Sequence, residues 1–380
     1  APGEPDDDAA AIAIDDALRG GRLSQRLACQ IETGSDARFG LVATAIGGGR
    51  LAHAAPGPRT RVVDAATGRE RYTFRSPSRG PAKALAMRGD ELAEVTDQGA
   101  LVRWSLGATQ ATALGATPGS FETVAAGRDG FWLVGFNLSI HRTTKDGVER
   151  VVGVPPVAGF VARTLGVFRD DTLLVASAKT AWRVDPRSGR TTPIDVPAGA
   201  GAIAACGDDV LLARAGGFFR IDGEGRRSMS LEVGGEDAIL GLAAERDGST
   251  AYVQKIDALY AVDPATGATR WVEHVEGSGD PVVGDGFVAV RAGTGASRFG
   301  GDGRTDRTIF VVRATGTLVE PFGPAAHAKI VSLAATAAAE GRPSLARVVV
   351  DPVWTWLSAD ERTAVEAAIE AAPDRTRRVR

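Results

Sequence analysis

Cysteine and histidine are scarce in this chain of 380 residues. The two cysteines, Cys29 and Cys206, lie far apart in the sequence, and the four histidines each stand alone. A disulfide framework needs several paired cysteines, and zinc sites use closely spaced cysteine and histidine ligands. The sequence therefore excludes a disulfide-rich scaffold and a local zinc site, although one long-range disulfide bridge remains open.

The net charge of the chain is small, and long apolar runs are absent from the sequence. The formal net charge is −3 at pH 7, whereas nucleic-acid binding usually needs a strongly basic surface. No apolar run approaches the ~20 residues that span a bilayer, and no basic segment followed by an apolar one begins the chain. We expect a soluble protein that binds no nucleic acid. The start at Ala1 without Met fits either a cytoplasmic protein or a periplasmic or secreted one after removal of a leader.

Glycine, in contrast, is abundant, with 48 residues, and many glycines belong to recurring turns. In LYAVDPATGATRW (259–271), two short strand-like segments flank a turn. Asp263 can accept hydrogen bonds from nearby backbone N–H groups, Pro264 presets φ, and Gly267 can adopt a left-handed conformation. This stretch predicts a β-hairpin.

Two series of such turns run through the chain, each with a spacing of about 40 residues. The first contains Gly68, Gly107, Gly147, Gly189, Gly225, Gly267 and Gly316, and the second contains the turns at 49–50, 89–90, 129–130, 170–171, 208–209, 247–248 and 285–286. Two hairpins per unit give four strands, and seven such units predict an all-β, seven-bladed β-propeller of four-stranded blades over residues 39–323.

The repeat resembles that of the quinoprotein-like β-propeller superfamily, which reads approximately lyAlDaaTGxxxW. Residues 259–271 match it closely, and residues 62–74 and 182–194 match in part. The resemblance implies the blade architecture. The related quinone-dependent dehydrogenases have eight blades and adjacent cysteines over the cofactor. Cys29 and Cys206 are not adjacent, so we expect no cofactor.

The flanks of the repeat predict short α-rich extensions. In the N-terminal extension (1–38), residues 5–19 predict a helix, and residues 26–33 predict a strand that could close the ring; residues 317–322 could fill the same place. In the C-terminal appendage (324–380), residues 325–341 and 358–372 predict helices, the second with a capping box from Ser358 to Glu361. We expect residues 346–357 to be extended.

Two segments are candidates for binding a protein partner. Residues 291–308 form the longest insertion in any unit, and Arg298, Phe299 and Arg304 are of residue types that are enriched at protein interfaces. The alternative is a mobile glycine-rich loop. Trp354 and Trp356 would share one face of an extended segment, either to fasten the appendage to the propeller or to form a docking patch.

No motif for nucleophilic, phosphate-binding or zinc-dependent catalysis is present. Asp302 and Asp306 lie on a glycine-rich loop, but that loop lacks the acidic alternation and the final Glu of a calcium loop. The sequence therefore favours a non-catalytic propeller that binds a protein partner as a scaffold or regulatory subunit. The alternative is a propeller hydrolase or lactonase with a metal ion in the central channel, which would need three or four carboxylates and amides converging there.

Overall fold

The computed structural model describes most of the chain. The described residues are 26–33, 43–155, 164–196, 202–314 and 324–371, with gaps at 56, 78, 108–109, 177–179, 215–216, 223–226, 233–238, 256–257, 274, 276, 278, 294–306, 342–345, 347–349 and 351–356. The chain forms two compact units. One spans Ala28–Thr315, and the other combines Ala1–Leu27 with Gly316–Arg380.

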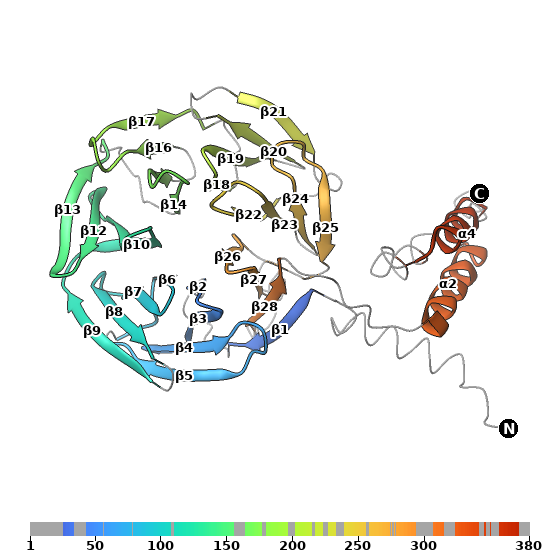
Figure 1. The fold of residues 1–380 in the computed structure, drawn as a ribbon, viewed down its shortest axis with the longest axis horizontal. Coiled ribbons are helices and arrows are strands. Elements are labelled where there is room, and N and C mark those ends of the chain that lie inside the picture. The colour runs from blue at the N-terminus through green and yellow to red at the C-terminus, as the bar shows by residue number, and fades with distance from the viewer. Residues whose placement is uncertain are drawn as a thin grey trace, which may run out of the picture. The chain divides into compact units, whose positions relative to one another are not determined.

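The larger unit is a ring of seven antiparallel sheets, each with four strands (Figure 1). Blade 1 contains β2 (Thr44–Gly47), β3 (Arg50–Ala55), β4 (Arg59–Asp64) and β5 (Glu70–Arg75). Blade 2 contains β6 (Ala84–Arg88), β7 (Glu91–Val95), β8 (Leu101–Leu106) and β9 (Ala111–Thr117). Blade 3 contains β10 (Phe121–Ala126), β11 (Phe131–Gly135), β12 (Ser139–Thr144) and β13 (Gly147–Gly153). Blade 4 contains β14 (Thr164–Val167), β15 (Leu173–Ala176), β16 (Ala181–Val184) and β17 (Thr191–Ile194).

Blade 5 contains β18 (Ile203–Cys206), β19 (Asp209–Arg214), β20 (Gly217–Ile221) and β21 (Arg227–Glu232). Blade 6 contains β22 (Gly241–Ala244), β23 (Ala251–Gln254), β24 (Leu259–Val262) and β25 (Thr269–Glu273). Blade 7 contains β26 (Val282–Gly284), β27 (Phe287–Gly293), β28 (Arg307–Arg313) and β1 (Leu27–Glu32). The predicted seven-bladed propeller of four-stranded blades is confirmed.

The ring closes through β1, a strand from the N-terminal side of the first blade. β1 pairs with β28 and is the outermost strand of blade 7. Ile31 on β1 is buried in the same apolar cluster as Ile309 on β28 and Leu51 on β3. Of the two segments that the sequence leaves open for this place, the N-terminal strand occupies it; residues 317–322 lie outside the described residues. Because β1 precedes blade 1 in the chain, this pairing joins the two ends of the propeller.

The predicted turn chemistry is present in the hairpins. Asp263 Oδ1 accepts hydrogen bonds from the N–H groups of Ala265 at 2.8 Å and Thr266 at 3.2 Å. Gly267 has a φ of +76°, in the left-handed region that only glycine adopts without strain. Its N–H donates to the Asp263 carbonyl at 2.8 Å, which closes the turn.

The hydrophobic core lies between neighbouring blades. The second strand of several blades is buried along its whole length, as in β11, β15 and β23. These strands are runs of apolar residues because both faces of an inner strand pack against another sheet. Trp104 of blade 2 and Val62 of blade 1, for example, are buried in the same apolar cluster.

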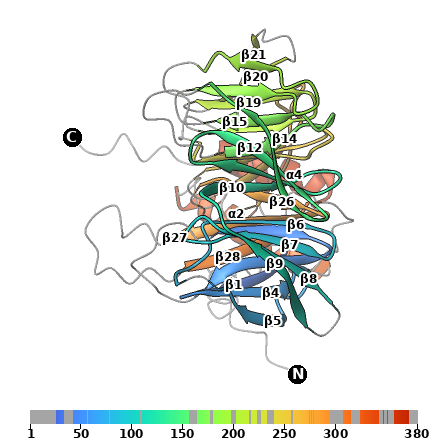
Figure 2. The same cartoon turned by 90° about the vertical axis from the view of Figure 1, so that its left-hand side faces the viewer.

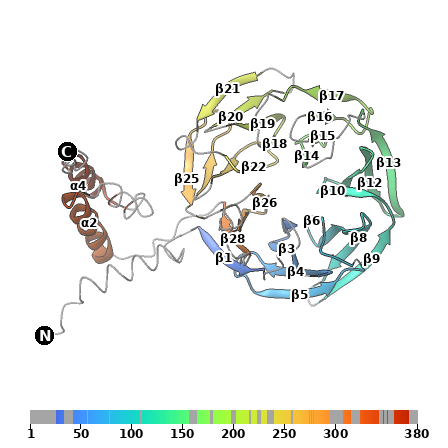
Figure 3. The same cartoon turned by 180° about the vertical axis from the view of Figure 1, so that it is seen from behind.

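The propeller has two faces that carry different connections between strands. Figure 2 shows the ring edge-on, and Figure 3 shows it from behind. In blades 1 to 6 the turn between the first and second strands and the turn between the third and fourth strands lie on one side, because consecutive strands are antiparallel; in blade 7 the turn between β26 and β27 takes the corresponding place. We call this side the turn face. The second-to-third connections and the links between blades lie on the opposite side, the linker face.

The smaller unit contains α2 (Pro324–Ala339) and α4 (Ala359–Glu370), which pack through apolar residues such as Ile330 and Val365. The capping box of Ser358 and Glu361 is confirmed. Ala346 and Val350 are helical, so the expected extended segment is wrong at these positions. Both residues are buried in the same cluster as Ile330 and Val365.

The predicted N-terminal helix (5–19) lies outside the described residues. The α-rich character of the two extensions therefore stays a prediction. In the part of the chain that the structure describes, no helix is both long and apolar enough to cross a membrane.

Candidate functional site

The first turns of the blades, between their innermost two strands, approach one another closely on the turn face. Gly207 of blade 5 and Gly248 of blade 6 have φ values of +61° and +78°. A Cβ atom at Gly207 would lie 3.2 Å from the Gly248 Cα atom, so glycine permits both the backbone conformation and the close contact. These turns form the second of the two series that the sequence predicts.

Charged side chains of these turns connect neighbouring blades. Arg50 of blade 1 forms an ion pair with Asp90 of blade 2 at 2.6 Å. The Gly49 N–H donates to Asp285 of blade 7 at 3.2 Å. Arg169 of blade 4 lies 3.8 Å from Asp208 of blade 5. Exposed pairs of this kind contribute at most about 1 kcal/mol each, so they align the turns more than they stabilise the ring.

Asp171 of blade 4 lies at the centre of an ion-pair network that reaches blade 3, which is adjacent to blade 4, and blade 6, which is not. Its side chain is 12% exposed and forms ion pairs with Arg128 of blade 3, at 3.5 Å, and with Arg246 of blade 6. Arg246 Nε also donates to the Phe168 carbonyl of blade 4 at 3.1 Å, and Arg169 donates in return to the Asp247 carbonyl of blade 6. Two arginines thus link blades 4 and 6 reciprocally.

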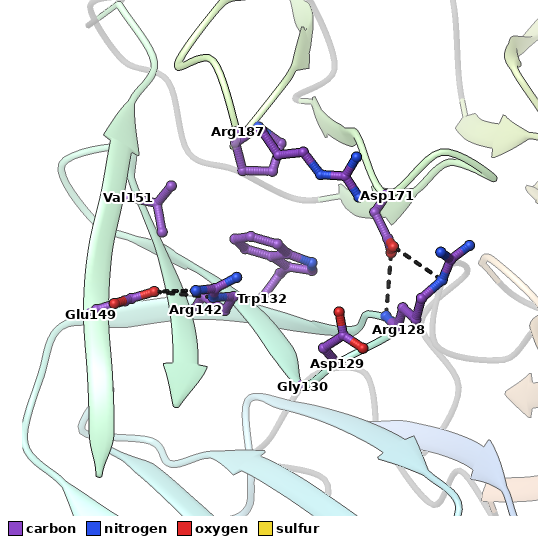
Figure 4. A pocket seen from close by; sticks show the side chains of 10 residues that line it. Arg128, Asp129, Gly130, Trp132, Arg142, Glu149, Val151, Asp171 and Arg187 are labelled. Atoms are coloured by element: carbon purple, nitrogen blue, oxygen red, sulfur yellow. Dashed lines mark hydrogen bonds and ion pairs between the residues drawn. The ribbon is translucent and has the colours of Figure 1, made fainter. Parts of the chain in front are cut away.

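A pocket of ≈ 260 Å³ opens beside this network, between blades 3 and 4 (Figure 4). Its lining comes from the β10–β11 turn, strands β11 to β13, and both turns of blade 4. The lining residues are Arg128, Asp129, Gly130, Trp132, Arg142, Glu149, Val151, Asp171, Pro186 and Arg187. We call it the blade 3–4 pocket.

An aromatic ring and charged groups share this pocket. The Arg142 guanidinium lies 5.9 Å from the centre of the Trp132 ring and forms an ion pair with Glu149 at 2.6 Å. Asp129 and Arg187 are exposed, and neither forms an ion pair with any residue that the structure describes. The pocket therefore presents a carboxylate and a guanidinium that have no ion-pair partner among the described residues, beside Trp132, which is 8% exposed. Hydrogen bonds lower the pKa of the nearby Asp185 carboxyl, and the charge of Arg187 also helps to lower it.

Two other pockets open on the same face. One of ≈ 500 Å³ lies between blades 4 and 5 and includes Asp170 and Arg183, which pair at 3.0 Å. The other, of ≈ 370 Å³, lies at blade 1 and includes Asp64 and Arg71, which pair at 2.7 Å. The turn face is thus hollowed at several places, and arginines and aspartates line each of these hollows.

Cys29, Cys206 and His53 are poorly suited to act as a nucleophile or a base at neutral pH. Burial raises the pKa of the Cys29 thiol to about 11 and that of Cys206 to about 12, so both stay protonated at neutral pH. Burial lowers the pKa of His53 to about 4, which keeps that imidazole neutral. No group of three or more metal-binding side chains occurs among the described residues.

One pair in blade 3 has the spacing of a nucleophile and a base. Ser139 Oγ lies 2.7 Å from His141 Nε2, because residues two apart on β12 share a face. Ser139 is buried, however, and its hydroxyl also contacts Asn137 Oδ1 at 2.6 Å. We therefore assign this pair to the local structure of the β11–β12 turn. In the sequence each histidine stands alone, so the analysis of the sequence missed this contact.

The residues predicted to bind a partner lie outside the described residues. Arg298, Phe299 and Arg304 belong to 294–306, and Trp354 and Trp356 belong to 351–356. The insertion lies between Gly293, at the end of β27, and Arg307, at the start of β28. These are the second and third strands of blade 7, so both of these ends lie on the linker face. The analysis of the sequence missed the blade 3–4 pocket because its residues come from two repeat units that meet only in the folded ring. In the sequence, Asp129 and Asp171 are recognisable only as turn residues.

Comparison with known proteins supports the fold. No family model and no curated protein matches the chain. Among solved structures, it is similar to BamB from Moraxella catarrhalis, with 14% identity and a TM-score of 0.47, over 72% of this chain and 85% of that one. It is also similar to the computationally designed Ika8 protein, with 13% identity and a TM-score of 0.51, over 76% and 99% of the two chains. At such identities the likeness concerns the propeller fold alone, which agrees with the seven four-stranded sheets of the structure.

Proposed function

We propose that this protein is a non-catalytic propeller that binds a protein partner on its turn face, with the blade 3–4 pocket as an anchor point. The pocket carries the proposal because it combines Trp132 and Arg142 with the charges of Asp129 and Arg187, which form no ion pair with the described residues. Tryptophan and arginine are the residue types that most often dominate binding energy at protein interfaces. At ≈ 260 Å³ the pocket is also smaller than the roughly 300–1,000 Å³ usual for small-molecule sites.

The partner chemistry follows from the charges in the pocket. Arg142 is already paired with Glu149, and Arg128 with Asp171, so these groups add little net attraction for a ligand. Asp129 and Arg187 remain to pair with a basic and an acidic group of the partner. We infer a polar protein surface that presents both signs of charge around one inserted side chain.

The insertion and the C-terminal tryptophans remain candidates for further partner contacts. Arg298, Phe299 and Arg304 would extend binding to the linker face, while Trp354 and Trp356 belong to the other unit. The hydrolase alternative has less support, since several carboxylates on the inner turns pair with arginines. Examples are Asp90, Asp171 and Asp208. That pairing is suited to joining blades rather than to coordinating a metal ion.

Affinity purification from the source cell tests this proposal, with bound proteins quantified by mass spectrometry. The variants are Arg187→Glu, a matched Arg59→Glu at the linker-face end of β4, and a chain in which residues 294–306 are replaced by a Gly-Ser linker. We expect a partner whose recovery falls about tenfold with Arg187→Glu, which corresponds to about 1.4 kcal/mol of binding free energy, and is unchanged with Arg59→Glu. Equal recovery from wild type and Arg187→Glu, or no partner in any sample, would overturn the assignment to this pocket.

A further inference from the structure

The outermost strand of blade 2 differs from the six other outermost strands. Among the strands that the structure describes, each outermost strand has a sheet neighbour on one side only, so no described strand pairs with its second edge. Five of the other strands carry at least one charged residue, and β17 carries Pro193, which are the usual protections of an exposed edge. β9, with the sequence ATALGAT, has neither a charge nor a proline.

β9 is also exposed along most of its length. Residues 112–116 are exposed, and Leu114 is 47% exposed. Leu114, Phe136 and Val272 are the exposed large hydrophobic side chains among the residues that the structure describes. In Figure 1, β9 runs along the outer rim of the ring, so its free edge points away from the neighbouring strand β8.

The local register explains why Leu114 stands out. A bulge in the β8–β9 pairing places Leu114 between the partners of Arg103 and Trp104. Blades 1 and 6 have the same bulge, at Arg71 and Arg270. These two arginines form ion pairs with Asp64 at 2.7 Å and Asp263 at 3.2 Å, respectively.

Blade 2 replaces both members of that ion pair. Ser105 follows the bulge on β8, where the other two blades have the aspartate, and Leu114 stands where they have the arginine. The change removes two charges from the rim and leaves an apolar side chain in their place. An edge strand without charges is a template for pairing with another chain.

We propose that the free edge of β9 binds an extended, uncharged segment of a protein partner, which adds a fifth strand to blade 2. This inference rests on the proposed function, since it names the kind of partner segment that the propeller binds. Main-chain hydrogen bonds would supply the affinity, and contact with Leu114 would select an apolar side chain. A charged residue opposite β9 would find no counterion on the strand.

A second copy of the chain fits this edge less well. The rim of the propeller is convex, so two copies could meet along little more than a pair of seven-residue strands (Figure 1). Stable protein interfaces bury about 1,200 Å² or more in total, and a second copy would need further contacts beyond this pair of strands to form one. A narrow extended segment follows the strand without needing a larger complementary surface.

Binding of a fluorescent, terminally blocked peptide of alternating threonine and valine to the full chain tests this inference. Threonine and valine favour strand conformation and carry no charge. The protein variants are Leu114→Lys and a matched Val272→Lys, which changes another exposed apolar residue on the outermost strand of blade 6. Fluorescence anisotropy gives the affinity, and amide hydrogen exchange locates the protected strand.

We expect Leu114→Lys to weaken peptide binding at least tenfold and Val272→Lys to leave it unchanged, with exchange protection over residues 111–117. Equal binding to wild type and Leu114→Lys, or protection confined to another strand, would overturn the inference. A wild-type dimer that Leu114→Lys converts to a monomer would also overturn it, in favour of a second copy. Failure of the peptide to bind, while a partner is still recovered through Arg187, would refute the inference and leave the proposed function standing.

Discussion

At the scale of single residues, Glu94 is an acidic group enclosed between blades 1 and 2. Its side chain is fully buried and accepts a hydrogen bond from Trp104 Nε1 at 3.2 Å. Burial raises the pKa of this carboxyl above its usual value of 4.5, and the hydrogen bonds from Ser76 and Trp104 offset part of the effect. Its ionisation therefore opposes folding at neutral pH.

Replacement of Glu94 by glutamine is expected to raise the midpoint of thermal unfolding at pH 7, because glutamine keeps an acceptor for Trp104 and removes the buried charge. The pKa of Glu94 is higher in the folded state than in the unfolded state. The wild-type carboxyl therefore favours folding most at pH values below its unfolded-state pKa of 4.5. That contribution is lost as pH rises through the folded pKa. The advantage of Glu94→Gln should therefore shrink when melting is compared at pH 4, and an advantage independent of pH would contradict this account.

Asp171 combines an ion-pair network with an unusual backbone. Its φ is +66°, which is unfavourable for residues other than glycine. We expect both Asp171→Ala and Asp171→Gly to lower the free energy of unfolding, since both remove the partner of Arg128 and Arg246. Glycine should lose about 1 kcal/mol less than alanine, because it adopts this φ without strain. Denaturant unfolding measures the difference, and a greater loss in the glycine variant would contradict the assignment of strain.

At the scale of single elements, the hairpins were predictable because their signal is local. Asp263 and Gly267 act within five residues of each other, and the sequence shows both. A local signal does not identify the ring-closing strand. Residues 26–33 and 317–322 are both possible strands, and their pairing depends on contacts with segments that are distant in the sequence. The helical residues Ala346 and Val350 were missed because valine-rich runs also suit strands.

Replacement of Gly267 by alanine tests the turn chemistry. We expect a loss of about 1–2 kcal/mol in the free energy of unfolding, because a Cβ atom is unfavourable at a φ of +76°. Ala265→Ser, at an exposed position of the same turn, serves as the control and should change stability by less than about 0.5 kcal/mol. Similar losses in the two variants would show that the left-handed conformation does not limit this turn.

At the scale of the whole molecule, the ring depends on a strand that lies before its first blade. β1 covers the edge of β28 and buries Ile31 beside Ile309. The blade 3–4 pocket likewise exists only in the assembled ring, because Asp129 and Arg187 come from different blades. The blade count could be predicted because the spacing of the turns is visible in the sequence. The candidate site could not be predicted because it depends on contacts between different repeats.

Truncation separates the role of β1 from that of the residues before it. A chain that lacks residues 1–33 is expected to unfold at a lower temperature than the full chain, or to aggregate, because β28 would become an open edge with an exposed apolar neighbour. A chain that lacks only residues 1–25 keeps β1 and should melt close to the full chain. Equal melting temperatures for both truncated chains would contradict closure by β1.

The most direct test of the central claim is the affinity of the propeller for the most abundant protein that it captures, measured by titration calorimetry. We predict that Arg187→Glu raises the Kd at least tenfold, while Arg59→Glu leaves it unchanged. An unchanged Kd for Arg187→Glu would contradict partner binding through the pocket between blades 3 and 4.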